Sequence, residues 1–462
     1  MASLIIGSYA KGAGANEEIQ LYLSGGGTKT PLTYKWHYIS PPVSSLAVST
    51  FAPTYTLDVA QWIENRPTFS LLEGWVAYDG WIYASQAMGG PTFSNLTAAK
   101  GYDYFRSSDK TYTFGGQINT GDINANLNYT SGNDDLYGYN LIGNPFTCGL
   151  DWDYIITHSY PSNTSKGLYF TRNSQLCSYI AGVGVPGDVT GIIPPMQGFF
   201  NKTYSSGNTI ILAAAARTHD NIHTTYKGSQ LIPLVRLEMT DSVYTDETVV
   251  RFDDYAKAYL DNDFDAQKLF LDPDMSSIHT FFDGVKYTIN GLPFPGENTI
   301  YELPVVINVI TDTTIRYFNA SQLQGLDNYN VKLTDNSTGI VYNLKTDPFV
   351  AFSSEKGIIA DRFVLKISNV LTDVILPSSD QAELNIYPAN SMINIQALSD
   401  KWDGQSGTLK VIEMTGRIVT TASSLEFSRN SLVQIPAPAV KGIYLVEART
   451  GMNRYVGKVV IR

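Results

Sequence analysis

Short runs of alternating apolar and polar residues recur along the whole chain, separated by clusters of Gly, Asn, Asp and Pro. Typical stretches read GGQINTGDINANLNYTSGNDD, VRLEMTDSVYTDETVVRFDD and VKLTDNSTGIVYNLKTD. A period of two places successive side chains on opposite faces of a β-strand, and the turn residues end each strand. We therefore predict an all-β protein of tandem β-sandwich domains, the last a small immunoglobulin-like sandwich. Helical periodicity is short, and its best stretch predicts one or two turns near residues 255–260.

Composition and charge exclude several classes of function. Charged residues make up 16% of the chain, aromatic residues 12%, and the formal net charge is -11. An acidic chain has no basic field to hold nucleic acid or an anionic bilayer, so we expect neither partner. We find no apolar run long enough for a transmembrane helix. The sequence begins MASLIIGSYAKGAGANEE, without a basic segment and a full hydrophobic segment, so we expect that the signal peptide of an exported form is already absent.

Two changes in composition predict the domain boundaries. One follows the alanine run at 213–216, and the other is the stretch LPSSDQAE near residue 380. We predict domains at 1–216 and 217–373, a linker at 374–382 and a third domain at 383–462. Within the first domain, WHYISPPV (36–43) and YNLIGNPF (139–146) echo each other, which favours two related half-sheets over chance similarity among strands.

Five motifs of the first domain occur in an order typical of a family of surface proteins. They lie at 36–43, 100–102, 113–121, 139–153 and 195–200, with Tyr139 where Trp is usual and Gly116 where Thr or a hydrophobic residue is common. In this respect the chain resembles adhesin-like ectodomains of exported Bacteroidota proteins. The segment 217–373 is similar to the module that commonly follows them. The resemblance implies a location at the cell surface and no particular activity.

The last eighty residues resemble the C-terminal sorting domain of the type IX secretion system. Ala389-Asn390 stands where Asn-Pro is usual, and Tyr444 and Val446 are expected on one strand face. The resemblance implies export, recognition by the type IX machinery at the outer membrane, and surface attachment. The residues that carry the motif are Ile386, Tyr387, Pro388, Gly416, Arg417, Gly442, Tyr444, Val446 and Lys458.

Three sets of side chains are candidates for other sites. Cys148 and Cys177 form either a disulfide or two buried free thiols, depending on the redox compartment. The rings of GWVAYDGWIYAS offer either a glycan-stacking surface or cross-strand packing. Asp261, Asp263 and Asp265 alternate like the start of a calcium loop, and the alternative is a solvated turn; calcium here is the one cofactor considered. The rings concerned are Trp75, Tyr78, Trp81 and Tyr83.

Signals of catalysis are few. Asp151 and Asp153 are spaced to share a strand face, although capping of backbone amides is the favoured alternative. The spacing of His219 and His223 suits a helix, whereas their surroundings indicate a turn, and the pattern around Asn133 is a weak cation candidate. Nucleophile-elbow, P-loop and Cys-x-x-Cys motifs do not occur.

We therefore expect a non-catalytic, exported cell-surface protein that acts as an adhesin or a structural component of the surface. A carbohydrate-binding module or a weak glycan hydrolase is the alternative. Its partners, beyond the secretion machinery, are expected to be a host or matrix protein, a glycan, or further copies of itself. Edge strands that pair between chains would give a filament or a surface layer.

Overall fold

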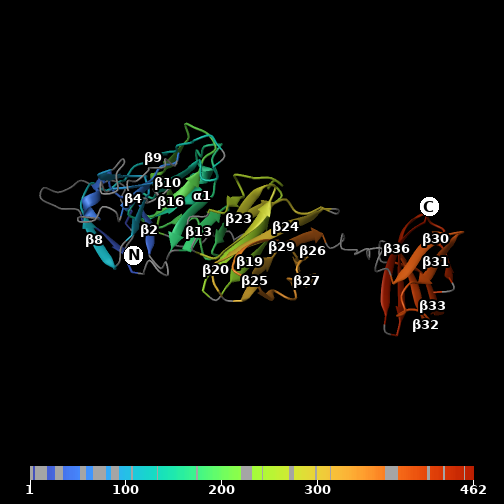
Figure 1. Cartoon of the computed structure of the whole chain (residues 1–462). Coiled ribbons are helices and arrows are strands. Elements are labelled where there is room, and N and C mark those ends of the chain that lie inside the picture. Colours follow the sequence, from blue (N-terminus) through green and yellow to red (C-terminus); the bar gives the residue numbers. More distant parts are fainter. Residues whose placement is uncertain are drawn as a thin grey trace. The chain divides into compact units, whose positions relative to one another are not determined.

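A computed structural model gives the structure of the chain (Figure 1). It describes residues 4–5, 18–26, 35–51, 59–65, 80–84, 93–105, 108–132, 134–172, 175–219, 231–241, 243–269, 275–296, 299–312, 314–369, 383–413, 417–429, 432–451 and 453–461. Strands dominate the described residues, and the prediction of an all-β protein is confirmed. The chain divides into two compact units, 1–372 and 373–462.

The first part of unit 1 contains six small antiparallel sheets. Helical structure here is α1 (Trp152–Thr157) and the 3-10 turns η1 (Val48–Thr50) and η4 (Ala214–Ala216). The sheets, in strand order, are β1 (Ile19–Leu23) with β8 (Lys110–Phe114); β2 (Trp36–Ile39), β7 (Tyr102–Phe105), β4 (Val59–Trp62) and β5 (Trp81–Tyr83); β3 (Ser45–Ala47) with β6 (Asn95–Thr97); β10 (Tyr139–Gly143), β16 (Gly198–Lys202), β12 (Leu168–Arg172), β13 (Gln175–Ile180) and β14 (Val183–Val185); β15 (Ile192–Ile193), β11 (Gly149–Asp151) and β18 (Arg217–Thr218); and β17 (Thr209–Leu212) with β9 (Ile123–Asn126).

The two echoing segments of the sequence have the same pairing register. In each, the isoleucine before the proline-containing turn lies opposite the aromatic residue that follows a glycine. Ile39 pairs with Tyr102 in the β2–β7 ladder, and Ile142 pairs with Phe199 in the β10–β16 ladder. Sequence similarity between the two stretches therefore corresponds to the same local structure.

The two half-sheets also exchange contacts reciprocally. Ile39 forms a β-bridge with Gln197 of the other half, and Ile142 forms the equivalent bridge with Lys100. Backbone hydrogen bonds repeat the exchange one residue further on: Ser40 N donates to Met196 O at 2.8 Å, and Gly143 N donates to Ala99 O at 3.1 Å. The two half-sheets therefore contact each other through equivalent residues.

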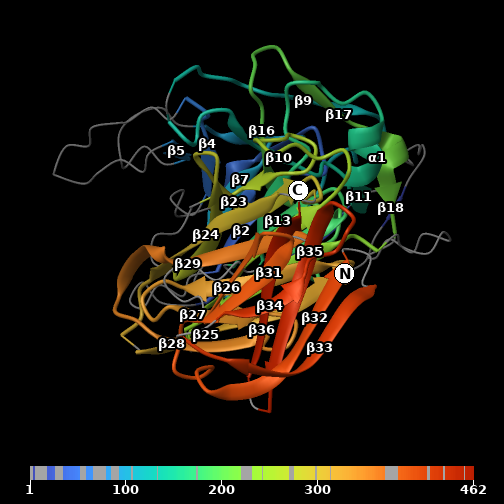
Figure 2. The same cartoon turned by 90° about the vertical axis from the view of Figure 1, so that its right-hand side faces the viewer.

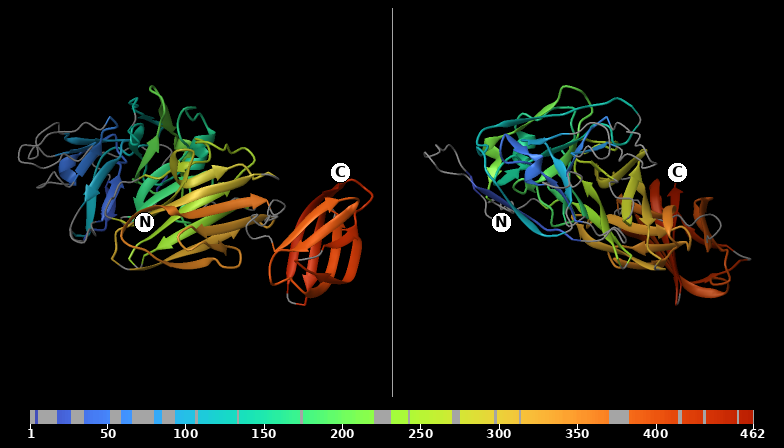
Figure 3. Two further views of the ribbon diagram at one scale, coloured as in Figure 1. Left: turned by 45° about the vertical axis from the view of Figure 1, so that its right-hand side comes forward. Right: turned by 60° about the vertical axis from the view of Figure 1, so that its left-hand side comes forward.

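An 11-stranded sheet forms the second part of unit 1, and its long strands are seen in Figure 3. One hydrophobic core is formed by buried side chains of these strands. Neighbours along the sheet are antiparallel except β20 and β23, which are parallel. The strand order is β27 (Ile340–Asn343), β26 (Tyr329–Asp335), β29 (Gly357–Asn369), β24 (Ile300–Val309), β22 (Ser277–Phe282), β23 (Val285–Leu292), β20 (Thr245–Phe252), β19 (Leu234–Thr240), β25 (Ile315–Gln324) and β28 (Phe349–Ser353), with β21 (Ala266–Gln267) pairing on β23.

The predicted division at residue 216 falls inside unit 1. One buried cluster takes Tyr139 and Phe200 from the first part and Val249 and Ile289 from the second. Arg251 also donates to the carbonyl oxygen of Ala181 at 2.5 Å. Because this apolar surface is buried only when both parts are together, the two predicted domains form one compact unit.

Unit 2 is a small β-sandwich of two sheets (Figure 2). Its core contains Trp402, Phe427 and Tyr444 from different elements, packed between the sheets. One sheet has the order β30 (Leu384–Ala389), β31 (Met392–Ala397) and β34 (Val433–Pro436). The other has the order β33 (Ile418–Phe427), β32 (Gln405–Glu413), β35 (Gly442–Thr450) and β36 (Arg454–Ile461).

Candidate functional site

The first part of the sorting motif lies on β30, which is an edge strand of its sheet. Ile386 is half-buried against the unit's core, and Tyr387 is half-buried beside it. Pro388 is exposed and follows them in the same strand. Proline cannot donate to a β-ladder, so an edge strand is where a sheet tolerates it.

The second part of the motif lies in the β35–β36 hairpin and has the predicted alternation. Tyr444 and Val446 are 3% and 0% exposed and face the core. Gly442 begins β35, and Lys458 is exposed on β36 opposite Leu445. Tyr444 donates its hydroxyl to the carbonyl oxygen of Val440 at 2.8 Å, which fixes the entry to the strand.

The turn between β32 and β33 is only partly described. Gly416 lies outside the described residues, so its predicted role in the turn stays a prediction. Arg417 is described, and its Nη2 lies 2.5 Å from Oε1 of Glu413. The backbone N–H of Glu413 donates to the carbonyl oxygen of Arg417. The ion pair and the backbone hydrogen bond between Glu413 and Arg417 therefore hold the end of β32 next to the start of β33.

Cys148 and Cys177 are free thiols, so the structure corresponds to the alternative without a disulfide. Both side chains are fully buried in one core of unit 1. Burial raises the pKa of Cys148 to about 11 and that of Cys177 to about 12. Because the thiolate is the reactive form, neither cysteine is a nucleophile near neutral pH.

The aromatic residues proposed for glycan stacking do not form an open surface where they are described. Trp81 lies opposite Trp62 in the β4–β5 ladder, and the ring centroids are 5.2 Å apart. Its ring also packs edge-on against Phe200, so Trp81 contributes to the core. Tyr83 is half-buried on the same strand. Trp75 and Tyr78 lie outside the described residues.

The aspartates proposed to bind calcium are occupied by other contacts. Asp265 accepts backbone N–H groups of Asp261 and Gly291, each at 2.6 Å. Asp261 accepts the N–H of Asp263, whose own carboxylate pairs with Lys166 at 2.9 Å. Among the described residues no group of three or more His, Cys, Asp or Glu is arranged to hold a metal ion. The carboxylates of this turn thus bind its own amides and a lysine, and calcium binding at Asp261, Asp263 and Asp265 stays a prediction.

Asp265 predicts a dependence of stability on pH. Burial raises its pKa to about 8, so the folded chain holds a proton there that the unfolded chain releases near pH 4. The free energy of unfolding therefore falls as the pH rises between these values. We expect Asp265→Asn to flatten this slope in urea unfolding of the full chain between about pH 5 and about pH 8. Asp263→Asn, at a half-exposed side chain, is the control and should keep the slope; an unchanged slope in Asp265→Asn would argue against the assignment.

Asp151 and Asp153, the two aspartates considered as a carboxylate pair, make different contacts in the structure. Asp151 caps α1 by accepting the N–H of Tyr154 at 3.0 Å, as the capping alternative predicts. Asp153 lies inside α1 rather than on a strand, and it accepts the hydroxyl of Tyr179 at 2.6 Å. Of the other candidates, His223 and Asn133 lie outside the described residues.

A lysine-rich cavity of about 490 Å³ lies where the two parts of unit 1 meet. Lys202 Nζ donates to the carbonyl oxygen of Asp135 at 3.0 Å and to Oε1 of Gln267 at 2.9 Å, and it lies 4.7 Å from the ring centroid of Tyr139. Burial lowers the pKa of Lys202 to about 8. Through its contacts with Asp135 and Gln267, the ammonium group of Lys202 links the first and second parts of unit 1.

An apolar groove of about 690 Å³ crosses the outer face of β22, β24 and β29, and we call it the β24 groove. Ile358 is 75% exposed there, and Phe281 is 37% exposed. Burial, with Lys268 and Lys286 nearby, lowers the pKa of His279 to about 3, so its ring is neutral. The groove is lined by Met275, Ser277, His279, Phe281, Lys286, Pro304, Val306, Asn308, Ile358, Ala360 and Asp361.

Sequence reasoning missed the β24 groove, although one signal for it was present. Strand β24 reads IYELPVVINV, and every second residue from Tyr301 to Val309 is buried in the core. Pro304 and Val306 lie on the opposite face of the strand and are only half-buried. A sheet face in contact with water is normally polar, so apolar residues of both parities indicate that each face has something to cover.

Comparison with known proteins identifies the carboxyl-terminal unit. Residues 385–462 match the model of a family described as secretion system C-terminal sorting domain. Unit 2 is therefore a sorting domain, and it directs the chain to export by type IX secretion and to the cell surface. No helix in the described part of the chain is long and apolar enough to cross a membrane.

The other comparisons add no argument about function. None of the curated proteins matches the chain by sequence. One solved structure, described as "Biofilm associated protein - BSP domain", covers 100% of this chain and 98% of its own length, with 8% identity and a TM-score of 0.14. A likeness of that size does not bear on the fold of unit 1.

Proposed function

We propose that the chain is a non-catalytic adhesin of the bacterial surface, delivered by unit 2, whose unit 1 binds its partner in the β24 groove. The observation that supports this most is the exposed apolar lining of that groove, in a protein that is exported. Exposed apolar surface on a secreted domain is costly unless a partner covers it. The motifs shared with exported Bacteroidota ectodomains support a source in that group.

The lining of the groove supports binding rather than hydrolysis. Glycoside hydrolysis ordinarily requires two carboxyl groups that flank the scissile bond. Asp361 is the one carboxylate among the described residues that line the groove, and the neutral ring of His279 lies in a largely apolar wall. This chemistry favours a protein partner that contributes apolar side chains, and the proposal includes no cofactor.

Carbohydrate binding is the second candidate, and a different surface favours it. Tyr255 and Tyr259 are 85% and 56% exposed on the loop that leads to β21. Exposed tyrosine rings offer flat apolar faces for sugar rings. Their position outside the β24 groove allows the two candidates to be tested separately.

A binding screen tests the adhesin proposal. The full chain is applied to arrays of matrix proteins and of glycans, and Ile358→Asp is expected to weaken binding to its matrix protein by about tenfold or more, because it places a carboxylate in the apolar groove. Ile340→Asp is the matched control: Ile340 is 47% exposed on β27 and does not line the groove. Loss of binding in Tyr255→Ala/Tyr259→Ala, with Ile358→Asp unaffected, would support the carbohydrate candidate instead.

A further inference from the structure

Five aliphatic side chains lie together on the outer face of the β33-β32-β35-β36 sheet of unit 2. The strand register brings them together: Ile412 lies opposite Ile418 and Leu445, and Ile443 lies opposite Val460. Residues directly opposite in a ladder project from the same side of the sheet. We call this set, Ile412, Ile418, Ile443, Leu445 and Val460, the outer aliphatic face.

Burial shows that these residues are not part of the core. Ile418 is 50% exposed, and Ile443 and Val460 are each 42% exposed. Their neighbours of opposite parity, Tyr444 and Val459, are buried at 3% and 2%. This end of the sheet is therefore apolar on both sides. A free-standing sandwich has no reason to place five aliphatic side chains in register on its solvated face, and such patches mark protein interfaces.

The charges around the outer aliphatic face are mainly positive. Lys458 lies opposite Leu445 and is exposed. Further along the same face, Glu447 accepts hydrogen bonds from Arg449 at 3.0 Å and Arg454 at 2.7 Å, and these arginines lower its pKa. These arginines therefore neutralise the carboxylate of Glu447, and Glu413, which follows Ile412 in β32, is paired with Arg417.

The charge balance of unit 2 differs in sign from that of the whole chain. Residues 373–462 contain nine lysines and arginines and eight aspartates and glutamates, whereas the formal net charge of the protein is -11. A surface that complements the outer aliphatic face is therefore apolar at its centre and acidic at its rim.

We propose that the outer aliphatic face is the surface by which unit 2 docks on a protein component of the type IX machinery, one that presents an apolar patch rimmed by carboxylates. The proposal rests on the sorting role of unit 2 and adds the residues that recognition uses. A second copy of the chain is a poorer partner, because a symmetric contact would bring Lys458 and the arginines of both copies together.

Two threonine substitutions test the docking surface in a host that secretes through the type IX system. Ile443→Thr/Val460→Thr in the full chain keeps β-branched residues in both strands and removes apolar contact area. We expect the surface-exposed fraction, measured by protease accessibility of intact cells, to fall about tenfold while the chain accumulates in the periplasm. Thermal unfolding of the purified variant, expected within a few degrees of the parent, verifies that unit 2 is folded.

The matched control is Leu432→Thr/Val440→Thr. It removes two exposed aliphatic residues of the same unit, 43% and 69% exposed, that are not on the outer aliphatic face, and it should be displayed normally. The docking surface alone would be overturned by one combination of results: the folded Ile443→Thr/Val460→Thr variant is displayed normally, while the chain ending at residue 372 stays in the periplasm. Normal display of the chain ending at residue 372 would overturn the sorting role. Loss of self-association in sedimentation with normal display would assign the face to a second copy and also overturn the proposal.

Discussion

Trp402→Ala is expected to unfold unit 2 and to stop display of the whole chain. Trp402 is fully buried, its ring packs edge-on against Phe427 at 5.2 Å, and its indole N–H donates to Glu383 at 2.7 Å. Truncation of a buried tryptophan costs about 3–5 kcal/mol. A domain of this size is stabilised by roughly 4–12 kcal/mol, so the substitution removes much of the stability of the sandwich.

Two measurements test this prediction together. Urea unfolding of the full chain should show an earlier transition for unit 2, and cell fractionation should show the chain in the periplasm. Leu398→Ala is the control, because Leu398 belongs to the same unit and is 43% exposed. Display at the parental level despite an unfolded unit 2 would mean that the machinery reads a linear signal and not the fold.

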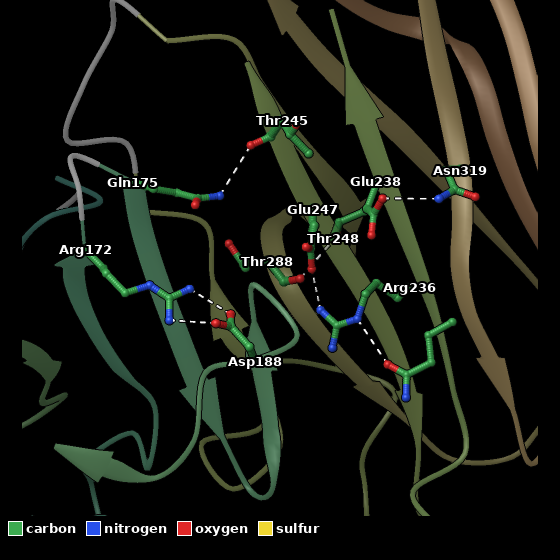
Figure 4. A network of polar contacts seen from close by, with 11 residues as sticks. Arg172, Gln175, Asp188, Arg236, Glu238, Thr245, Glu247, Thr248, Thr288 and Asn319 are labelled. Atoms are coloured by element: carbon green, nitrogen blue, oxygen red, sulfur yellow. Dashed lines mark hydrogen bonds and ion pairs between the residues drawn. The ribbon is translucent and has the colours of Figure 1, made fainter. Parts of the chain in front are cut away.

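Arg236→Leu is expected to destabilise unit 1 by about 3–5 kcal/mol, because it leaves Glu247 buried without its partner. Nη1 of Arg236 lies 2.5 Å from Oε2 of Glu247, and the two side chains are 6% and 10% exposed (Figure 4). Burial already raises the pKa of Glu247 even with the guanidinium in place. Removing both charges leaves no buried ion, so Arg236→Leu/Glu247→Leu should recover most of the loss.

Urea unfolding of the two variants and the parent measures this difference. The control is Arg172→Leu, which breaks the ion pair of Arg172 with Asp188, shown in the same view (Figure 4). These side chains are 41% and 68% exposed, so the control should cost about 1 kcal/mol or less. The prediction fails if the double variant is as unstable as Arg236→Leu, since the cost would then come from lost packing and not from an unpaired charge.

Local pattern was sufficient to predict the features that depend on a single strand or hairpin. The alternation of β35 places Tyr444 and Val446 inside, and Ile443 on the opposite face, as period two requires. Ile39 and Ile142 occupy matching positions in their two ladders, and this could likewise be predicted from two short stretches of sequence. Such features need no knowledge of distant partners.

Features that depend on distant partners could not be predicted in this way. Residues 255–260 have helical periodicity but form no helix, because Asp253 accepts the N–H of Tyr255 and nearby aspartates bind further amides of the loop. The core shared by Phe200 and Ile289, and the β24 groove formed by three strands, depend on contacts between segments far apart in the sequence.

The central claim is that unit 2 carries the address of the protein. The measurement that tests it most directly is the surface-exposed fraction of the chain ending at residue 372, compared with the full chain in the same type IX-secreting host. Because unit 1 is a compact unit of its own, the shortened chain should fold and remain in the periplasm. Surface display of the shortened chain at the level of the full chain would contradict the account.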